Sequence, residues 1–199
     1  VIPNGFQLDY YKENQTTRNK LKKKLKIKKN QIIVGSVGRY VELKNYDLFI
    51  QIAKQLSKKN DNFRFMLIGN QMSKKNKVLV NQLKNENLLE KFYLLGEKKN
   101  INEYYNVMDF YIHTSKTEGF SNAIAESMSS SVITFATDAG DTKKIICSNY
   151  FLVNEKSFMN TCNKINLISN LNLKDFNSIR KKMRNKIKLN FNINKIKYL

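Results

Sequence analysis

The feature that most constrains the fold of this 199-residue chain is an alternation of short apolar runs with segments of helical period. The runs are rich in β-branched and aromatic residues, which is typical of buried strands. The expected strands are Gln31–Val37, Phe63–Gly69, Phe92–Gly96, Asp109–Ser115, Val132–Thr137 and Tyr150–Val153. The expected helices are Asn45–Lys59, Asn76–Leu88, Asn102–Val107, Ser121–Met128 and a short one near residues 142–146. Because such an alternation forms βαβ units, the sequence predicts an α/β fold, a Rossmann-like parallel sheet with helices on both faces.

Glycines and polar residues directly follow five of the expected strands. These positions are Gly38–Arg39, Gly69–Asn70, Gly96–Glu97, Thr114–Ser115 and Thr137–Gly140. Open α/β sheets bind ligands in the crevice outside the carboxyl ends of their strands. The sequence therefore predicts a binding site along this single edge of the sheet.

A glycine and two cations come after the first expected strand. Gly38 lets the backbone approach a ligand closely, while Arg39 and Lys44 bring a fork of donors and a point charge to the strand end. This combination suits a diphosphate. The alternative is that both cations are ordinary surface residues, since the chain contains 36 lysines and arginines.

Two glutamates eight positions apart, Glu118 and Glu126, flank the start of the helix expected after the fourth strand. Ser121 is the expected N-cap, so the free backbone amides that follow Gly119 and Phe120 would form an anion site. Carboxylates would repel phosphates, and these two should therefore accept hydrogen bonds from sugar or ribose hydroxyls. Spacing alone fits two solvent-exposed acids somewhat better, so this pattern does not decide between the two interpretations.

Two further loops and one side chain belong to the same edge. The segment Leu94–Ile101 could hold a nucleobase with backbone amides and an apolar wall, and Phe135–Ile145 contains a glycine turn before a helix start. His113 is the only histidine and ends the fourth strand. A lone histidine is usually packed or superficial, so its role stays open.

The net charge of +20 points to nucleic acid or an anionic membrane surface as a partner class. The basic run Lys20–Lys29 fits a solvated helix face as well, and aromatics do not alternate with cations as in nucleic-acid-binding surfaces. We therefore expect no nucleic-acid partner. No apolar run approaches the ~18 residues of a membrane-spanning helix.

The two cysteines, Cys147 and Cys162, lack any metal-ligand spacing, so free thiols and no structural metal are expected. A reducing compartment is the simplest setting for such thiols. Val1 in place of methionine suggests that the chain is a piece of a longer protein.

Six motifs in a fixed order carry a resemblance to a known family. They are PNGF at Pro3–Phe6, VGRYVELKN at Val37–Asn45, FMLIG at Phe65–Gly69, LLG at Leu94–Gly96, the run Tyr104–Met128 and FATDAG at Phe135–Gly140. Together they resemble retaining glycosyltransferases of family 4, which have the GT-B fold. The likeness covers the C-terminal, donor-binding domain and extends from Pro3 to about Ile146.

The resemblance implies a role for each residue of the edge. Glu126 would hold the nucleotide ribose, and Glu118 would lie beside the donor sugar. Arg39 and Lys44 would grip the donor diphosphate and neutralise the leaving group, which makes them, with Glu118, the catalytic residues. The donor-binding residues would be Gly38, Asn70, Glu97, Gly119, Phe120, Ser121, Asn122 and Glu126. No metal and no cofactor beyond the nucleotide-sugar substrate is expected.

The resemblance also implies how the chain is organised. Residues 1–199 would form one nucleotide-sugar-binding domain, with a core at about 30–170 and a helical tail at 174–199 that packs toward an upstream acceptor domain absent from this chain. The expected reaction moves a sugar, with retention, from a UDP- or GDP-sugar to a glycan or lipid-linked acceptor. The alternatives are a noncatalytic nucleotide-sugar-binding module and, less favoured, a basic nucleic-acid-binding domain. The expected location is the cytoplasm, with the basic charge favouring the cytoplasmic face of an anionic membrane.

Overall fold

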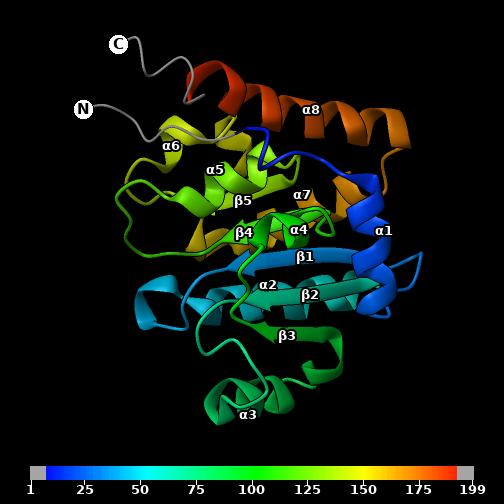
Figure 1. Ribbon diagram of the computed structural model, residues 1–199. Coiled ribbons are helices and arrows are strands. Elements are labelled where there is room, and N and C mark those ends of the chain that lie inside the picture. Colours follow the sequence, from blue (N-terminus) through cyan, green and yellow to red (C-terminus); the bar gives the residue numbers. More distant parts are fainter. Residues whose placement is uncertain (1–7, 192–199) are drawn as a thin grey trace.

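A computed structural model describes residues 8–191 and shows a six-stranded sheet in which all strands are parallel (Figure 1). The strands are β1 (Ile32–Val37), β2 (Phe63–Ile68), β3 (Phe92–Gly96), β4 (Phe110–His113), β5 (Ile133–Thr137) and β6 (Leu152–Val153). Their order across the sheet is β3-β2-β1-β4-β5-β6. This is the order of doubly wound dinucleotide-binding folds. The predicted fold class is therefore confirmed.

Helices cover both faces of the sheet (Figure 1). They are α1 (Gln15–Lys24), α2 (Tyr46–Lys59), α3 (Lys77–Asn85), α4 (Ile101–Tyr105), α5 (Asn122–Ser129), α6 (Thr142–Ile145), α7 (Phe158–Ser169) and α8 (Leu173–Asn190). On one face α2 packs against α7, and on the other α5 packs against α8 and α1 against α4. Short 3-10 turns at Glu42–Lys44, Leu89–Lys91, Asn149–Phe151 and Glu155–Ser157 complete the connections.

The core lies between the sheet and its two helical layers. On the α2 face, Phe49 makes edge-to-face contacts with Phe65 of β2 and Phe92 of β3, and the rings of Phe65 and Phe92 lie 5.0 Å apart. Each such aromatic pair adds about 0.5–1.5 kcal/mol beyond the burial of its surface. On the opposite face, Tyr111 of β4 meets Tyr105 of α4 edge-to-face across 6.0 Å. Packing on both faces fixes the strand ends on which the site depends.

Helix α2 illustrates how the sequence sets the loop at the end of β1. Asn45 precedes it in a left-handed conformation, and its side chain accepts a hydrogen bond from the amide of Leu48. The last turn carries Lys58 and Lys59, which suit the negative end of the helix dipole. The loop that carries Lys44 is thus tied to the start of a well-anchored helix.

Several element boundaries differ from the sequence-based prediction. The expected strand Tyr150–Val153 is shorter than predicted, because Tyr150 and Phe151 form a 3-10 turn and only Leu152 and Val153 pair with β5. Helix α7 was not predicted at all. Its buried positions Thr161, Cys162, Ile165 and Ile168 have helical period, a signal that the sequence contained.

The lysine-rich tail was expected to be helical and to pack toward a missing half. Its described part is α8, which lies along α5 of this domain with Met183 and Ile187 buried. The remaining predicted tail, residues 192–199, and the PNGF motif at Pro3–Phe6 lie outside the described residues. No helix within residues 8–191 is both long enough and apolar enough to cross a membrane.

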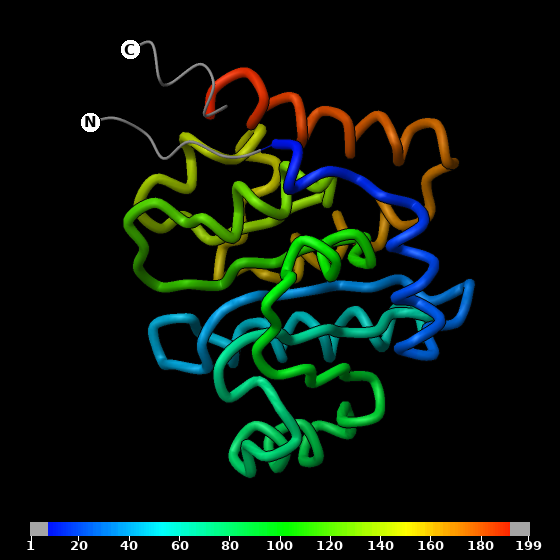
Figure 2. The backbone as a smooth tube through the Cα atoms, viewed as in Figure 1, coloured from blue at the N-terminus to red at the C-terminus, as the bar shows by residue number. Residues whose placement is uncertain are grey.

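The strand order reverses between β1 and β4, which are neighbours in the sheet although β2 and β3 separate them in the chain. Connections on the two sides of such a switch point diverge and leave a crevice at the carboxyl ends. In the backbone tube of Figure 2, the chain leaves β1 in one direction and leaves β4 in the other. We therefore expect the ligand-binding site at the carboxyl ends of β1 and β4.

Candidate functional site

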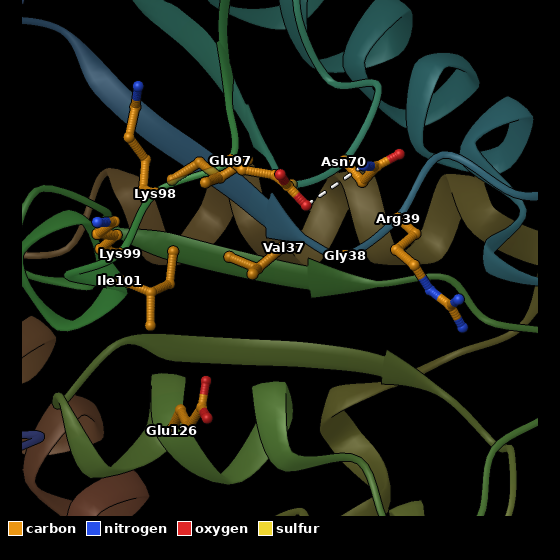
Figure 3. A pocket seen from close by; sticks show the side chains of 11 residues that line it. Val37, Gly38, Arg39, Asn70, Glu97, Lys98, Lys99, Ile101 and Glu126 are labelled. Carbon is orange, nitrogen blue, oxygen red and sulfur yellow. Dashed lines mark hydrogen bonds between the residues drawn. The ribbon is translucent and has the colours of Figure 1, made fainter.

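A pocket of about 640 Å³ opens at the carboxyl ends of β1 and β2. Its lining comes from those strand ends, from residues 97–99 after β3, from Ile101 of α4 and from Glu126 of α5. Figure 3 shows the carboxylate of Glu126 pointing from α5 toward the strand ends, with Asn70 and Glu97 on the far side. Residues from five separate elements thus converge on one concavity.

The floor of the pocket depends on a close approach of two glycines. A Cβ added to Gly69 would lie 2.0 Å from the carbonyl oxygen of Gly38, and Gly69 has a φ of +141°, which other residues rarely adopt. Beside them, Asn70 Nδ2 donates to Glu97 Oε1 over 3.3 Å. The loops after β1, β2 and β3 are therefore joined to one another at the pocket.

Glu126 faces the pocket from the second turn of α5. The hydroxyl of Tyr105 lies 3.0 Å from its Oε2 atom and donates to it, because an ionised carboxylate only accepts. Tyr105 is fully buried, and this burial, together with nearby Tyr111 and Glu126, raises its pKa well above 10. The carboxylate is therefore held by a donor that stays protonated.

A second cluster surrounds Glu118, on the loop between β4 and α5. Its Oε1 atom pairs with the ammonium of Lys44 and lies 2.8 Å from His113 Nε2 and 2.7 Å from Ser115 Oγ. The loop that carries Lys44 is itself fixed to the end of β4, since Thr114 Oγ1 donates to the Lys44 carbonyl over 2.8 Å. A carboxylate, an ammonium and an imidazole thus meet beside the switch point.

Hydrogen bonds dominate the electrostatics of Glu118. The bond from His113 is the largest cause that lowers its pKa, which falls to about 2. Bonds from Lys44 and Ser115 act in the same direction, whereas partial burial opposes them. Glu118 is consequently an anion at neutral pH.

His113 is only 3% exposed, and burial lowers its pKa below 6.5 although the bond to Glu118 opposes this shift. Its Nδ1 atom lies 3.2 Å from the Tyr111 hydroxyl. A neutral imidazole has one N–H, and the carboxylate can only accept, so Nε2 carries the proton and Nδ1 accepts from Tyr111. His113 therefore belongs to the site, which its sequence context had left open.

The start of α5 differs in detail from the expectation. Ser121 occupies the N-cap position, but its side chain makes no capping bond and instead approaches His113 Nε2 at 3.3 Å. Phe120 packs edge-to-face against Phe191 after α8, and Asn122 is exposed. Nothing lies within 4 Å of a Cβ placed on Gly119, so this glycine faces open space.

The loop after β5 supports that open segment from behind. A Cβ on Gly140 would lie 2.0 Å from the Glu118 carbonyl oxygen, and the amide of Asp141 donates to the Gly119 carbonyl over 3.0 Å. Gly140 has a positive φ of 54°. The loop after β5, within the predicted segment Phe135–Ile145, thus positions the start of α5 through direct backbone contacts.

The structure divides the predicted site residues into two groups. Five of them line the pocket, namely Gly38, Arg39, Asn70, Glu97 and Glu126. The other six, Lys44, Glu118, Gly119, Phe120, Ser121 and Asn122, belong to the cluster at β4 and α5 or to the helix start that follows it. Sequence reasoning placed Ser115 at this edge without giving it a role, and it did not identify Tyr105 or Tyr111, although both lie in the longest motif.

Residues 8–191 contain no group of three or more His, Cys, Asp or Glu that could hold a metal ion. Both cysteines are free, and burial raises the pKa of each to about 11. Neither thiol is activated as a nucleophile.

A doubly wound sheet with cations and glutamates beside its switch point is an architecture that many nucleotide-binding domains share. The sequence matches the family of glycosyl transferases group 1 over residues 17–189. Because this match spans most of the chain, the chain belongs to that family.

Relatives of the chain include proteins that are named as glycosyltransferases. It is 26% identical over 200 residues to the UDP-Gal:α-D-GlcNAc-diphosphoundecaprenol α-1,3-galactosyltransferase of Escherichia coli, an alignment that covers 97% of this chain and 50% of that protein. It is 24% identical to the putative glycosyltransferase EpsF of Bacillus subtilis, which covers 70% of this chain and 36% of EpsF. The chain thus spans half or less of these relatives.

Solved structures share the fold. HepE of Anabaena in complex with UDP and glucose superposes with a TM-score of 0.87 at 22% identity, covering all of this chain and 54% of HepE. The C-terminal domain of LpcC from Francisella tularensis superposes with a TM-score of 0.77 at 22% identity, covering 95% of this chain and all of that domain. The chain has the Rossmann-like architecture of one half of a GT-B glycosyltransferase.

Proposed function

We propose that this domain binds the nucleotide-diphosphate-sugar donor of a retaining glycosyltransferase of family 4. The observation that carries the proposal is the pocket of about 640 Å³ that Arg39 and Glu126 line from opposite sides of the switch point. Arg39 lines one side of this pocket and the carboxylate of Glu126 faces it from α5, and Glu97, Lys98 and Lys99 also line it. A nucleoside diphosphate has the matching order of groups, with an anionic diphosphate beside a ribose that carries two hydroxyls.

The nucleoside would occupy the part of the pocket between α4 and α5. Ile101 supplies an apolar wall for a base, and the loop of residues 97–99 lies beside it. Glu126, already positioned by Tyr105, would accept hydrogen bonds from the ribose hydroxyls. UDP is the first nucleotide to test, because HepE, which shares the fold, was solved with UDP.

The diphosphate would lie toward Arg39 and Lys44. Arg39 is exposed, and its guanidinium forms no ion pair within the described chain, so its donors are available to a ligand. Lys44 is already paired with Glu118, which holds its ammonium at the switch point. Fixed cations at the position of the leaving diphosphate stabilise the negative charge that develops there, so we propose transfer without a metal.

The donor sugar would then lie near Glu118 and the open backbone at Gly119. Glu118 is an anion with part of its surface exposed, and it can accept from sugar hydroxyls or stabilise positive charge at the reacting carbon. The acceptor is proposed to be a glycan or a lipid-linked glycan, as the name of the Escherichia coli relative indicates for that enzyme. Acceptor binding would need chain beyond this domain.

The test is a calorimetric titration of the chain with UDP, GDP and ADP, each with and without EDTA. We expect one of the three to bind below millimolar with no effect of the chelator. Failure of all three nucleotides to bind below about 1 mM would contradict donor binding. A requirement for a divalent metal would contradict the metal-independent part of the proposal alone.

A further inference from the structure

We propose that a second pocket, at the amino ends of β1 and β4, binds the headgroup of an anionic phospholipid. This pocket has a volume of about 300 Å³, and its lining comes from α1, from the starts of the two strands and from the segment between α7 and α8. We call it the basal pocket. Because the strands are parallel, it lies at the opposite edge of the sheet from the donor pocket, so the inference goes beyond the proposed function and does not depend on it.

Three basic side chains line the basal pocket, Arg18 and Lys22 from α1 and Lys29 from the loop before β1. Asp109 is the only acid among the described residues that line it. This carboxylate is already engaged, since Arg18 Nη2 donates to Oδ1 over 2.6 Å and the amide of Ile33 donates to Oδ2 over 2.8 Å. Three cations against one occupied carboxylate leave an excess of positive charge, which suits an anionic ligand.

Two of these cations lack an acceptor. Within residues 8–191 the ammonium groups of Lys22 and Lys29 form no hydrogen bond and no ion pair. Lys22 is half-buried, and burial is the largest cause that lowers its pKa, with the charge of Arg18 acting in the same direction. Partial removal of an ammonium from water without an acceptor is unfavourable, and a bound phosphate would supply that acceptor.

Apolar side chains form much of the remaining lining. The rings of Phe110 and Phe176 meet edge-to-face with centroids 5.9 Å apart, and Ile32 lines the same pocket. Leu171 before α8 and Leu173 at its start also line the pocket, yet they are 36% and 75% exposed. Exposed leucines beside lysines are typical of surfaces that contact a membrane interface, where cations meet headgroups and apolar side chains enter the acyl boundary.

A phospholipid matches both parts of this lining. Its phosphate would lie at Lys22 and Lys29, and its glycerol and first acyl carbons would cover Leu171 and Leu173. The volume is at the lower end of ligand pockets, so it suits a headgroup and leaves the acyl chains outside. A free phosphate would leave both leucines exposed to water. A second copy of this chain fits poorly, since each copy carries a net charge of +20.

The test begins with calorimetric titration of the chain with three probes, each below its micelle-forming concentration. Dihexanoyl-phosphatidylglycerol carries a negative charge and acyl chains, dihexanoyl-phosphatidylcholine carries the chains without net charge, and glycerol 3-phosphate lacks the chains. We expect the phosphatidylglycerol to bind at least about tenfold more tightly than either other probe. Equal binding of the phosphatidylcholine would remove the role of the cations, and equal binding of glycerol 3-phosphate would assign the pocket to a free phosphate. Either result would overturn the inference, as would no binding of the phosphatidylglycerol.

A pair of double variants separates the basal pocket from the overall charge. Lys22→Met with Lys29→Met should weaken phosphatidylglycerol binding by at least about tenfold, because charge-assisted hydrogen bonds are lost. Lys74→Met with Lys75→Met is the matched control, since it removes the same charge from two exposed lysines between β2 and α3, outside the basal pocket. Equal weakening by the two double variants would show that net charge alone attracts the lipid, and would overturn the inference.

Leu173→Asn tests the apolar part of the lining. It should weaken phosphatidylglycerol binding about threefold or more and leave the affinity for glycerol 3-phosphate unchanged. Unchanged phosphatidylglycerol affinity would overturn the lipid assignment. Sedimentation of the unsubstituted chain at rising concentration is the last check, because a dimer that Leu173→Asn dissociates would assign this surface to a second copy and overturn the inference as well.

UDP binding distinguishes this inference from the proposed function. The variants at Lys22, Lys29 and Leu173 should bind UDP as the unsubstituted chain does, because the donor pocket lies at the other edge of the sheet. A loss of UDP binding in these variants equal to their loss of lipid binding would show a general structural effect and overturn the inference. Absence of UDP binding by the unsubstituted chain, with phosphatidylglycerol still bound, would contradict the proposed function and support the inference.

Discussion

His113 Nε2 lies 2.8 Å from Glu118 Oε1, and this bond joins the only histidine of the chain to one of its three site glutamates. The histidine is buried and neutral, while the glutamate is anionic. The bond therefore fixes the orientation of Glu118 without cancelling its charge. Lys44, on the other side of the same oxygen, provides the charge balance.

The first prediction concerns stability against pH. In the folded chain the pKa of His113 lies below its ordinary 6.5. Below about pH 6.5 the unfolded chain therefore binds a proton at His113 more readily than the folded chain, which favours unfolding. The free energy of unfolding, measured with urea, should therefore decrease between about pH 7 and pH 5.5. His113→Gln, which keeps a donor toward Glu118, should flatten this slope.

By the same reasoning, Glu118 affects the free energy of unfolding over a separate, lower pH range. Its pKa falls from 4.5 to about 2 on folding, so its contribution to stability is present above about pH 4.5 and is lost as the pH falls toward 2. Glu118→Gln removes the charge that opposes the lowering of the His113 pKa, so it should steepen the slope between pH 7 and 5.5 while reducing the slope below pH 4.5. An unchanged slope near neutrality in His113→Gln would contradict the assignment of a buried neutral imidazole.

The second prediction tests the glycine contact under the pocket. Gly69→Ala places a Cβ against the Gly38 carbonyl at a positive φ, so it should destabilise the fold by roughly 1–3 kcal/mol and weaken UDP binding. Gly119→Ala is the control, since open space surrounds that position, and its stability should change by about 0.5 kcal/mol or less. Thermal unfolding of the two variants measures this difference. Equal melting temperatures would contradict the close approach of Gly69 to the Gly38 carbonyl.

The third prediction tests whether Arg39 and Lys44 contribute more to UDP binding than the other basic residues do. Arg39→Met and Lys44→Met should each weaken UDP binding by about 10- to 100-fold, the value of a charge-assisted hydrogen bond. Lys116→Met is the control, because Lys116 pairs with the exposed Glu42 at 3.3 Å, away from the pocket. If Lys116→Met weakens binding as much as the other two, the basic surface as a whole attracts the nucleotide and no specific grip exists.

The fourth prediction concerns Arg184 as a clamp. Arg184→Lys cannot satisfy the carbonyls of Leu8, Tyr11 and Ser129 together, so it should destabilise the fold by about 1–3 kcal/mol. Lys188→Met, on the exposed side of the same helix, should have little effect. Urea unfolding measures both. Equal stability of the Arg184→Lys variant and the unsubstituted chain would exclude the clamp.

The fold was predictable because each strand and most helices have a local signature. The glycines and polar residues after the strands also predicted the edge of the sheet at which the pocket opens, since parallel strands bring all their carboxyl ends together. Helix α7 was not predicted, although its buried positions Thr161, Cys162, Ile165 and Ile168 have helical period.

The details of the site were less predictable because they depend on contacts between distant segments. The pairing of Lys44 with Glu118 joins residues 74 positions apart, and the Arg184 clamp joins residues 173 and 176 positions apart. No periodicity encodes such contacts. His113 could not be placed from its sequence either, because its burial depends on Tyr111 and on the turn that returns Glu118 to the strand end.

The decisive experiment compares the dissociation constant of UDP for the unsubstituted chain and for Glu126→Gln, with Glu90→Gln as the exposed control. We expect submillimolar binding to the unsubstituted chain and to the control, and at least about tenfold weaker binding to Glu126→Gln, since one charged acceptor is lost. Identical affinity in all three proteins would contradict the assignment of the pocket as the donor site.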